Sequence, residues 1–251
     1  KIKAVAARIS ELHKQDTNVV AVVSAMGKTT NQLIELANQV SERPNRRELD
    51  MLLTTGERVS MALVTMALHD LSCPAISFTG SQAGILTNES HFNAYITDVK
   101  ATRVDEAIKE NKVVVLAGFQ GVSPKTKEIT TLGRGGSDSS AVAMAAYLNA
   151  ERCEILKDVP AVFTTDPNLV KEAKVINELN YDQLYEMTYW GAKVLYHRSV
   201  DLAREKKVPL YIGPASQKTT EGTFVDQNRG EKKLKALSVN SHETVFKITC
   251  E

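Results

Sequence analysis

The chain has 251 residues, of which 43% are hydrophobic and 24% charged, so a large buried core is possible in one large domain or two small ones. Its 31 lysines and arginines balance 30 aspartates and glutamates, which gives a formal net charge of +1. This balance argues against a basic nucleic-acid-binding face and against a polybasic membrane patch, so we expect neither nucleic acid nor a membrane as a partner.

The cysteine and histidine spacings predict a reduced protein without a metal site. Cys73, Cys153 and Cys250 lie far apart with no C-x-x-C pair, which is typical of reduced thiols in a cytoplasmic protein. The five histidines are scattered without metal-ligand spacing. No apolar run approaches the roughly 20 residues of a membrane span. Lys1–Gln15 has an amphipathic helical pattern and does not resemble a signal peptide.

Helix and strand patterns alternate along the chain. Asn18–Ala25 is a β-branched apolar run, as in a buried parallel strand, and a long helical pattern over Arg47–Leu71 is interrupted only at Thr54–Gly56. The other expected helices are Lys1–Gln15, Thr30–Val40, Arg103–Glu110, Gly136–Asn149 and one or two within Tyr181–Glu205, and the other expected strands are Ala75–Phe78, Val113–Phe119, Cys153–Leu156 and Val208–Ile212. This alternation predicts an α/β layered domain with a mainly parallel central sheet.

The chain changes character near its end. Gln227–Lys233 is polar and charged, and Leu234–Val239 and Glu243–Thr249 then alternate like antiparallel strands. We therefore predict a first domain over residues 1–226 and, over residues 227–251, a linker with the start of a second domain.

The most informative segment for function is the glycine-rich turn within Thr130–Ala145 (TTLGRGGSDSSAVAMA). Glycines permit positive φ angles and close backbone approach, and Ser137 and Asp138 are favoured at the start of the Ala-rich helix that follows. A helix N-terminus presents N–H groups and a partial positive charge to an anion, and Arg134 adds a guanidinium suited to a carboxylate or phosphate. A capped tight turn with an exposed arginine is the alternative. The segment matches neither G-x-G-x-x-G nor a Walker loop.

This segment, with AGFQG at Ala117–Gly121, resembles the substrate loop of aspartate kinases in the amino-acid kinase superfamily. Other segments resemble family motifs in the family's order: VVSAMGKTTN at 22–31, TGERVS at 55–60, FTGSQAGI at 78–85, CEILKDVPAVFTTDP at 153–167 and GAKVLYHRS at 191–199. The resemblance implies a three-layer αβα amino-acid kinase-like fold with a mainly parallel central sheet. It also implies that the tail begins an ACT-type regulatory domain.

By this resemblance, the substrate residues surround an amino acid that carries both charges. Glu57 would accept the α-ammonium group of aspartate, and Arg134 would bind its α-carboxylate. The expected substrate-binding residues are Thr30, Glu57, Phe119, Arg134, Gly135, Gly136, Ser137 and Asp138, and the expected catalytic residues are Ser24, Arg134 and Asp138. An exposed helix face, ordinary helix capping and core packing are the alternatives for these positions.

The expected nucleotide residues follow a strand that ends in Lys157 and Asp158, because α/β proteins bind ligands at the carboxyl ends of strands. The resemblance assigns ATP binding to Lys157, Asp158, Phe163, Asp166 and Lys193. The family pattern T-D-V-x-G-[VI]-[YF]-T-x-D-P is altered here, with Lys157 in place of Thr and Ala161 in place of Gly. A turn-forming aspartate, a buried strand aromatic and an exposed lysine are the alternatives.

The resemblance implies ATP-dependent phosphorylation of the β-carboxylate of L-aspartate to β-aspartyl phosphate, the first step of lysine, threonine and methionine biosynthesis. Mg²⁺ would arrive with ATP, and a homodimer would form through the regulatory domain. The family's N-terminal segment, V-x-K-F-G-G-T-S, does not occur in these 251 residues, so we predict little or no kinase activity for a polypeptide of this sequence alone. The alternatives are a superfamily kinase of the glutamate or acetylglutamate type and a non-catalytic, amino-acid-binding pseudokinase.

Overall fold

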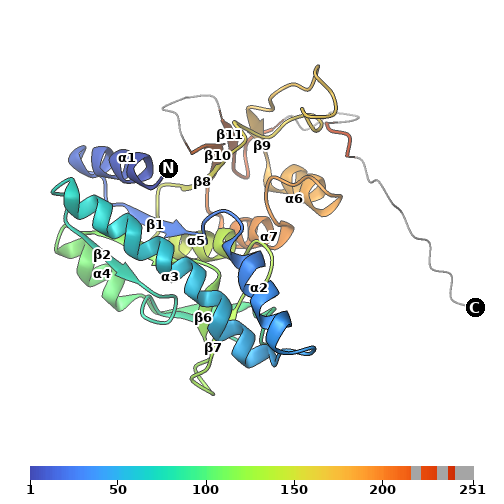
Figure 1. The fold of residues 1–251 in the computed structure, drawn as a ribbon. Helices are drawn as coiled ribbons and strands as arrows, with labels where there is room; N and C mark the ends of the chain where they lie inside the picture. The colour runs from blue at the N-terminus through green and yellow to red at the C-terminus, as the bar shows by residue number, and fades with distance from the viewer. Residues whose placement is uncertain (216–221, 231–236, 241–251) are drawn as a thin grey trace, which may run out of the picture. The chain divides into compact units, whose positions relative to one another are not determined.

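The computed structural model describes residues 1–215, 222–230 and 237–240. The chain divides into two compact units, Lys1–Ala150 and Glu151–Glu251, and Figure 1 shows their helices and strands, with labels where there is room. The sequence patterns do not indicate this division. The boundary predicted between residues 226 and 227 remains a prediction, because much of the chain beyond it lies outside the described residues.

Unit 1 is built on a three-stranded parallel sheet. Its strands are β1 (Val20–Val23), β5 (Val113–Ala117) and β2 (Ala75–Phe78), paired in that order. Every residue of the central strand β5 is buried. An uninterrupted β-branched run is what a strand covered on both faces requires. The predicted parallel strands are therefore confirmed in this unit.

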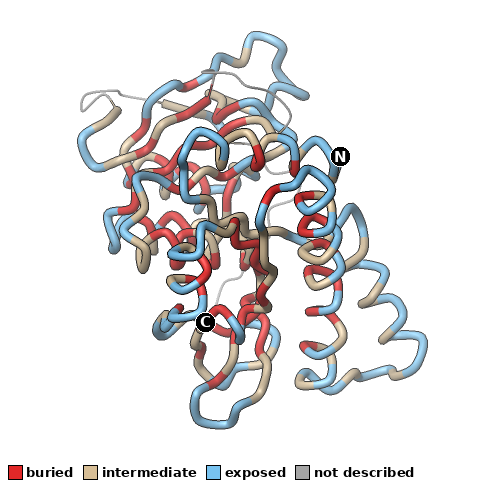
Figure 2. The backbone as a smooth tube through the Cα atoms, turned by 90° about the vertical axis from the view of Figure 1, so that its left-hand side faces the viewer, coloured by how far each residue is buried: buried red, intermediate tan, exposed pale blue. Residues whose placement is uncertain are grey.

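Helices cover both faces of this sheet. Val113 and Val115 pack with residues of α1 (Ile2–Lys14) and α3 (Arg46–Asp70) in one buried cluster. Val114 and Leu116 pack in a second cluster with α4 (Thr102–Lys109) and α5 (Gly136–Tyr147). Side chains of a strand alternate between its faces, so β5 separates the two clusters. In Figure 2 buried and exposed residues alternate along the helical segments, as expected for helices that pack on one side only. The αβα layering is confirmed.

A second sheet in unit 1 is mixed. It consists of β4 (Ile96–Val99), β3 (Ile85–Thr87), β6 (Gln120–Val122) and β7 (Ile129–Thr131), in that order. β3 pairs antiparallel with β4 and parallel with β6, and β6 pairs antiparallel with β7. These strands have three or four residues each, too few to give a clear alternation, and the sequence patterns did not predict them.

Helix α3 is continuous through Thr54–Gly56, so the interruption expected there is wrong. The Thr54 hydroxyl donates to the Met51 carbonyl at 3.1 Å, and the Thr55 hydroxyl donates to the Leu52 carbonyl at 2.7 Å. These residues lower helix propensity, but the packing of a long helix outweighs such local preferences.

The same helix bears on the expectation that no apolar segment approaches the length of a membrane span. α3 has 25 residues, and an 18-residue window within it has a mean hydropathy of 1.2, which suits a membrane span by length and composition alone. Its buried residues include Asp50 and Glu57, and it packs against α1, β2, β5 and β7. α3 is thus the core helix of unit 1.

The described residues of unit 2 form a four-stranded sheet and two helices. The strand order is β8 (Cys153–Lys157), β10 (Leu210–Pro214), β11 (Thr223–Val225) and β9 (Glu178–Leu179), and β8 and β10 are parallel. α6 (Tyr181–Tyr189) begins with a capping box formed by Asn180 and Gln183, and α7 (His197–Lys206) follows.

The predicted tail strands are only partly described. Residues 237–240 form no strand, so the strand expected over Leu234–Val239 does not extend through its last residues. Glu243–Thr249 and Cys250 lie outside the described residues, as does most of the expected ACT-type segment. Cys73 and Cys153 are buried and form no disulfide.

The two faces of α3 should respond differently to truncation. Leu68 is fully buried, whereas Met66 is 61% exposed. Replacing Leu68 with Ala leaves a cavity in the core cluster, so the free energy of unfolding should fall by about 2–5 kcal/mol. Met66→Ala is the matched control and should change it by less than about 0.5 kcal/mol. Urea unfolding measures both, and equal losses would contradict the packing of α3.

Candidate functional site

The carboxyl ends of β1 and β5 lie side by side in unit 1. Val23 and Ala117 are register partners, and the Gly118 N–H donates to the Val23 carbonyl at 3.0 Å. Ser24 therefore leaves β1 next to the point where Phe119 leaves β5. In α/β proteins this edge of a parallel sheet is where ligands bind.

Glu57 of α3 reaches the turn that follows β1. Its Oε1 accepts a hydrogen bond from the Ala25 N–H at 3.1 Å. The residue is only 4% exposed, and within residues 1–215, 222–230 and 237–240 its buried Oε2 has no hydrogen-bond partner. Burial raises the pKa of Glu57 above its ordinary value, and the Ala25 hydrogen bond opposes that rise. A buried carboxylate with one unsatisfied oxygen is costly, so a cationic or N–H donor from a ligand would be favoured there.

Gly56 allows this approach of α3. A Cβ atom at Gly56 would lie 2.9 Å from the Ala25 Cβ and 3.5 Å from the Thr29 Cγ2. Real Cβ contacts are longer than the first of these distances, so a side chain at residue 56 would push the helix away from the turn. The glycine that suggests a helix break in the sequence therefore positions Glu57.

The glycine-rich turn has the conformation that its sequence predicts. Gly133 has φ +72° and Gly135 has φ +66°, both in the left-handed region, and Gly135 is the N-cap of α5. A Cβ at Gly118 would lie 2.8 Å from the Ser137 Cβ and Oγ. The first turn of α5 thus packs directly on the chain leaving β5, and its N-terminus carries the partial positive charge of the helix.

Ser140 fixes the backbone of Phe119 to α5, a role that the sequence patterns did not indicate. Phe119 has φ +66°, unusual for a residue with a side chain. Its N–H donates to the Ser140 Oγ at 3.2 Å, and the Ser140 hydroxyl donates to the Gly136 carbonyl at 2.9 Å. Strained backbone persists where several contacts determine it, and it gathers at functional sites.

The structure brings together most of the expected substrate-binding and catalytic residues. Adjacent segments at the edge of the β1–β5 pair carry Ser24, Thr30, Glu57, Phe119, Gly135, Gly136, Ser137 and Asp138. Thr30 lies in the first turn of α2 (Thr29–Val40). Arg134 is exposed in the glycine-rich turn, and in the described part of the chain no hydrogen bond or ion pair joins it to Glu57.

The expected nucleotide residues lie in unit 2. Lys157 ends β8 beside Pro214 of β10, and its carbonyl accepts from the Ala215 N–H at 3.0 Å. Asp158 follows in an exposed position, Phe163 is half-buried, and Lys193 is exposed between α6 and α7.

Asp166 forms a local turn. Its Oδ1 accepts from the backbone N–H of Asn168 at 2.8 Å and from the Asn168 Nδ2 at 3.0 Å. This is the turn-forming alternative considered for the residue before Pro167.

A cavity of about 1000 Å³ in unit 2 is separate from these expected positions. Its lining includes Lys174, Tyr181, Lys207 and Arg229, and it includes none of the five expected nucleotide residues. Within residues 1–215, 222–230 and 237–240, no group of three His, Cys, Asp or Glu side chains is placed to hold a metal ion.

Comparison with known sequences decides the family. The amino acid kinase family model matches residues 1–214, most of the chain. The chain belongs to the amino acid kinase family. The expected family and fold of this amino acid kinase chain are thereby confirmed.

Relatives of this amino acid kinase chain include aspartokinases. It is 47% identical over 250 residues to the aspartokinase of Geobacillus stearothermophilus, covering 99% of this chain and 61% of that protein. The crystal structure of aspartate kinase from Synechocystis superposes with a TM-score of 0.79 at 46% identity, covering 90% of this chain and 37% of that one. E. coli aspartokinase III in complex with aspartate and ADP superposes at 0.77 with 25% identity, covering 92% and 62%. The chain thus spans about three fifths of the Geobacillus relative's length.

Gly56→Ala should destabilise this amino acid kinase chain although alanine favours helices. Alanine is about 1 kcal/mol more favourable than glycine within a helix. Overpacking against the Ala25 Cβ, which cannot move without its backbone, typically costs about 1–3 kcal/mol. We expect a lower Tm and faster amide exchange at Ala25, whose N–H is bonded to Glu57. Val59→Ala, at a 49% exposed position of the same helix, is the control and should leave both values nearly unchanged. A more stable Gly56→Ala variant would contradict the close contact.

Glu57→Gln should stabilise the ligand-free protein at neutral pH. Because the folded-state pKa of Glu57 is raised, the folded state binds the proton more tightly than the unfolded state. Stability is therefore lost as pH rises from about 4.3, the ordinary Glu value, through the raised value. The Tm advantage of the neutral glutamine should grow between about pH 4.5 and 7.5.

Glu35→Gln, on an exposed position of α2, is the matched control for this experiment. The effect of Glu35→Gln on the Tm should stay small both at about pH 4.5 and at about pH 7.5. A Tm advantage of Glu57→Gln that is the same at both would show that the burial of the Glu57 charge does not limit stability.

Proposed function

We propose that this chain carries the catalytic region of an aspartate kinase, which transfers the γ-phosphoryl group of ATP to the β-carboxylate of L-aspartate. The observation that carries the proposal is the buried, half-satisfied carboxylate of Glu57 at the edge where α5 begins. A negative acceptor and a positive helix terminus at one edge suit a ligand that carries both charges.

The amino acid is held through its charged groups. The Glu57 Oε2 accepts the α-ammonium group, which satisfies an oxygen that has no hydrogen-bond partner among the residues that the structure describes. Arg134 binds the α-carboxylate from the glycine-rich turn. Gly135, Gly136 and Ser137 provide the backbone and first helical turn of α5 beside this carboxylate, and Phe119 forms the adjoining wall.

The chemistry requires positioning more than proton transfer. The β-carboxylate has an ordinary pKa of about 4, so at neutral pH it is ionised and needs no general base. One of its oxygens attacks the γ-phosphorus, a C–O–P linkage forms, and the bond to the leaving ADP oxygen breaks. Mg²⁺ bound to ATP supplies counter-charge on the phosphates. In this chain Ser24, Thr30 and Asp138 orient the acceptor and the transferred group, and Arg134 reduces the repulsion between the two anions.

The nucleotide is assigned to unit 2. Lys157 and Asp158 follow the carboxyl end of β8, Phe163 and Asp166 lie in the segment that follows, and Lys193 contributes a cation to the phosphates. The position at the end of a parallel strand supports this assignment. Cytoplasmic location, dimerisation through a C-terminal regulatory domain and a place in lysine, threonine and methionine biosynthesis remain predictions.

Two other functions compete with this one. A superfamily kinase for glutamate or acetylglutamate would share the fold, and a pseudokinase would bind an amino acid without turnover. Glu57 favours a substrate with a free ammonium group, because an acetylated amine carries no charge to pair with it. The similarity of this chain to aspartokinases supports aspartate rather than glutamate as its substrate.

The test uses a polypeptide extended to the length of the aspartokinase relatives. ATP-dependent acyl phosphate is trapped with hydroxylamine, using L-aspartate, L-glutamate and N-acetyl-L-aspartate as acceptors. We expect product with aspartate and very little with the other two. Glu57→Gln should raise the KM for aspartate by roughly 10–100-fold, the value of a charge-assisted hydrogen bond of about 1.5–3 kcal/mol. It should also narrow the preference for aspartate over its N-acetyl derivative.

Glu48→Gln, an exposed glutamate on the same helix, is the matched control and should leave the KM for aspartate unchanged. Product with glutamate alone would overturn the choice of substrate. Amino-acid binding without any product would identify the pseudokinase.

A further inference from the structure

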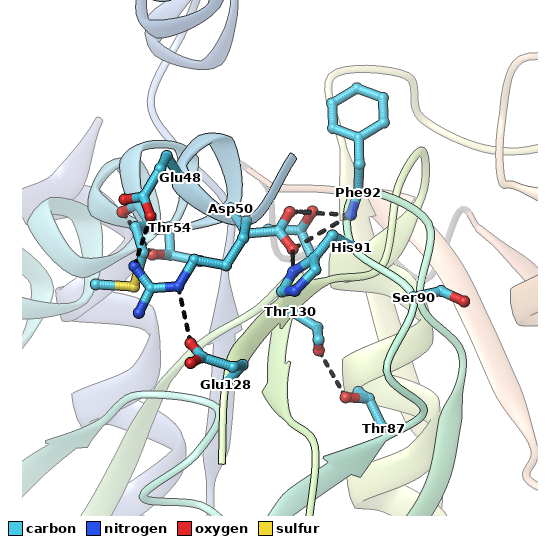
Figure 3. A network of polar contacts seen from close by, with 12 residues as sticks. Glu48, Asp50, Thr54, Thr87, Ser90, His91, Phe92, Glu128 and Thr130 are labelled. Carbon is cyan, nitrogen blue, oxygen red and sulfur yellow. Dashed lines mark hydrogen bonds and ion pairs between the residues drawn. The ribbon is translucent and has the colours of Figure 1, made fainter. Parts of the chain in front are cut away.

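A second carboxylate of α3, that of Asp50, is completely buried and fully paired (Figure 3). Its Oδ1 accepts from the Thr131 hydroxyl at 2.6 Å and from the Phe92 N–H at 3.0 Å. Its Oδ2 lies 2.7 Å from the His91 Nδ1 and 3.2 Å from the Phe92 nitrogen. Burying a carboxylate costs several kcal/mol unless its oxygens are satisfied, and here donors from two other segments satisfy them.

These donors join α3 to two segments that are far away in the sequence. Thr131 is the last residue of β7, and His91 and Phe92 belong to the loop between β3 and β4. The Ala94 N–H also donates to the Thr131 carbonyl at 2.9 Å, so the loop is bonded to β7 directly as well as through Asp50. Removal of the Asp50 carboxylate would break the bonds through which α3 holds the loop beside β7.

Phe92 is held in an unusual backbone conformation. Its φ is +69°, in the left-handed region, which is unfavourable for a residue with a side chain. In Figure 3 its N–H faces Asp50 while its ring points away, and the residue is 40% exposed. The ring therefore gains little from burial, and the bifurcated hydrogen bond to Asp50 is what keeps the backbone in place.

The loop packs against the glycine-rich turn. A Cβ at Gly133 would lie 3.0 Å from the Asn93 Oδ1 and 3.3 Å from the Phe92 carbonyl oxygen. Gly133 precedes Arg134 and has φ +72°, so the backbone that presents the arginine rests on residues that Asp50 fixes.

We infer that Asp50 is a positioning residue for the turn that carries Arg134, acting through the Phe92–Asn93 backbone and Thr131. The inference rests on the proposed function of Glu57 and Arg134. Asp50 and Glu57 are seven residues apart on one helix, about two turns or 10 Å along its axis. One rigid helix therefore carries both Glu57, which accepts the ammonium group, and Asp50, which supports the turn of Arg134. The helix thereby sets the distance between the sites for the α-ammonium and the α-carboxylate groups.

The experiment compares Asp50→Asn with wild type in the polypeptide extended to the relatives' length. Asparagine keeps the size but offers one acceptor oxygen in place of two, so the Phe92, His91 and Thr131 donors cannot all be satisfied. We expect the KM for aspartate to rise at least tenfold while the KM for ATP changes less than twofold. Amide hydrogen exchange should become faster in residues 88–94 and 132–136.

Thr87→Val is the matched control for lost stability. It removes one partner of the buried Thr87–Thr130 hydroxyl pair, 2.6 Å apart in the same sheet, and leaves the hydrogen bonds of Asp50 intact (Figure 3). It should lower the Tm but leave the KM for aspartate and exchange in residues 132–136 unchanged. If Asp50→Asn does not fold, His91→Phe keeps an aromatic ring but removes a single hydrogen-bond partner at the partly exposed edge of the network, and it should raise the KM for aspartate severalfold.

The outcomes separate this inference from the proposed function. If wild type phosphorylates aspartate and the Asp50 and His91 variants keep its KM, or raise both KM values equally, Asp50 is only structural. Exchange is measured without turnover, so unchanged exchange in residues 132–136 of Asp50→Asn overturns the inference even for a chain that phosphorylates no aspartate. Failure of wild type to use aspartate, together with faster exchange in the variant, overturns the proposed function and leaves the support of the turn by Asp50 intact.

Discussion

The burial of the Glu57 carboxylate beside the turn after β1 is the constraint on which the site depends. One of its oxygens accepts the N–H of Ala25, and for the other the described part of the chain offers no hydrogen-bond partner. Gly56 makes the approach possible, because any larger residue would meet Ala25. An isolated folding unit gains nothing from such a carboxylate, since burial without full pairing opposes folding. Its presence is explained when a ligand completes the pairing, as at other sites where function overrides local stability.

The sequence could predict the elements that are covered on both faces or long enough to show a period. The strand at Val113–Ala117 and the helix at Ile2–Lys14 were predicted because an apolar run and a 3.6-residue repeat specify them locally. The short strands of the mixed sheet, such as Ile85–Thr87, could not be predicted, because their partners and not their own residues determine them. The break expected at Thr54–Gly56 failed for a related reason, since Gly56 serves a tertiary contact.

The sequence likewise predicts one part of the candidate site and not the rest. The left-handed glycines and the helix start at Gly136 follow from the residues of one segment, so the sequence predicts an anion-binding turn there. The network around Asp50 joins positions 41, 42 and 81 residues apart, and no local pattern in His91, Phe92 or Thr131 indicates it. Resemblance to a family predicts the role of Glu57, whereas only the structure shows that its carboxylate is buried and that one oxygen is unpaired within the described residues.

Helix α3 carries two buried carboxylates, and the difference in their pairing separates their roles. Asp50 is satisfied from within the chain by a hydroxyl, a backbone N–H and an imidazole, so it has no capacity left for a ligand. Glu57 keeps one oxygen unpaired on the same buried face, two turns later. A fully paired buried charge stabilises one arrangement of the segments around it, whereas a half-paired charge favours a molecule that brings the missing donor. Under the proposed function, the same helix provides a fixed support at one end of the site and a ligand acceptor at the other.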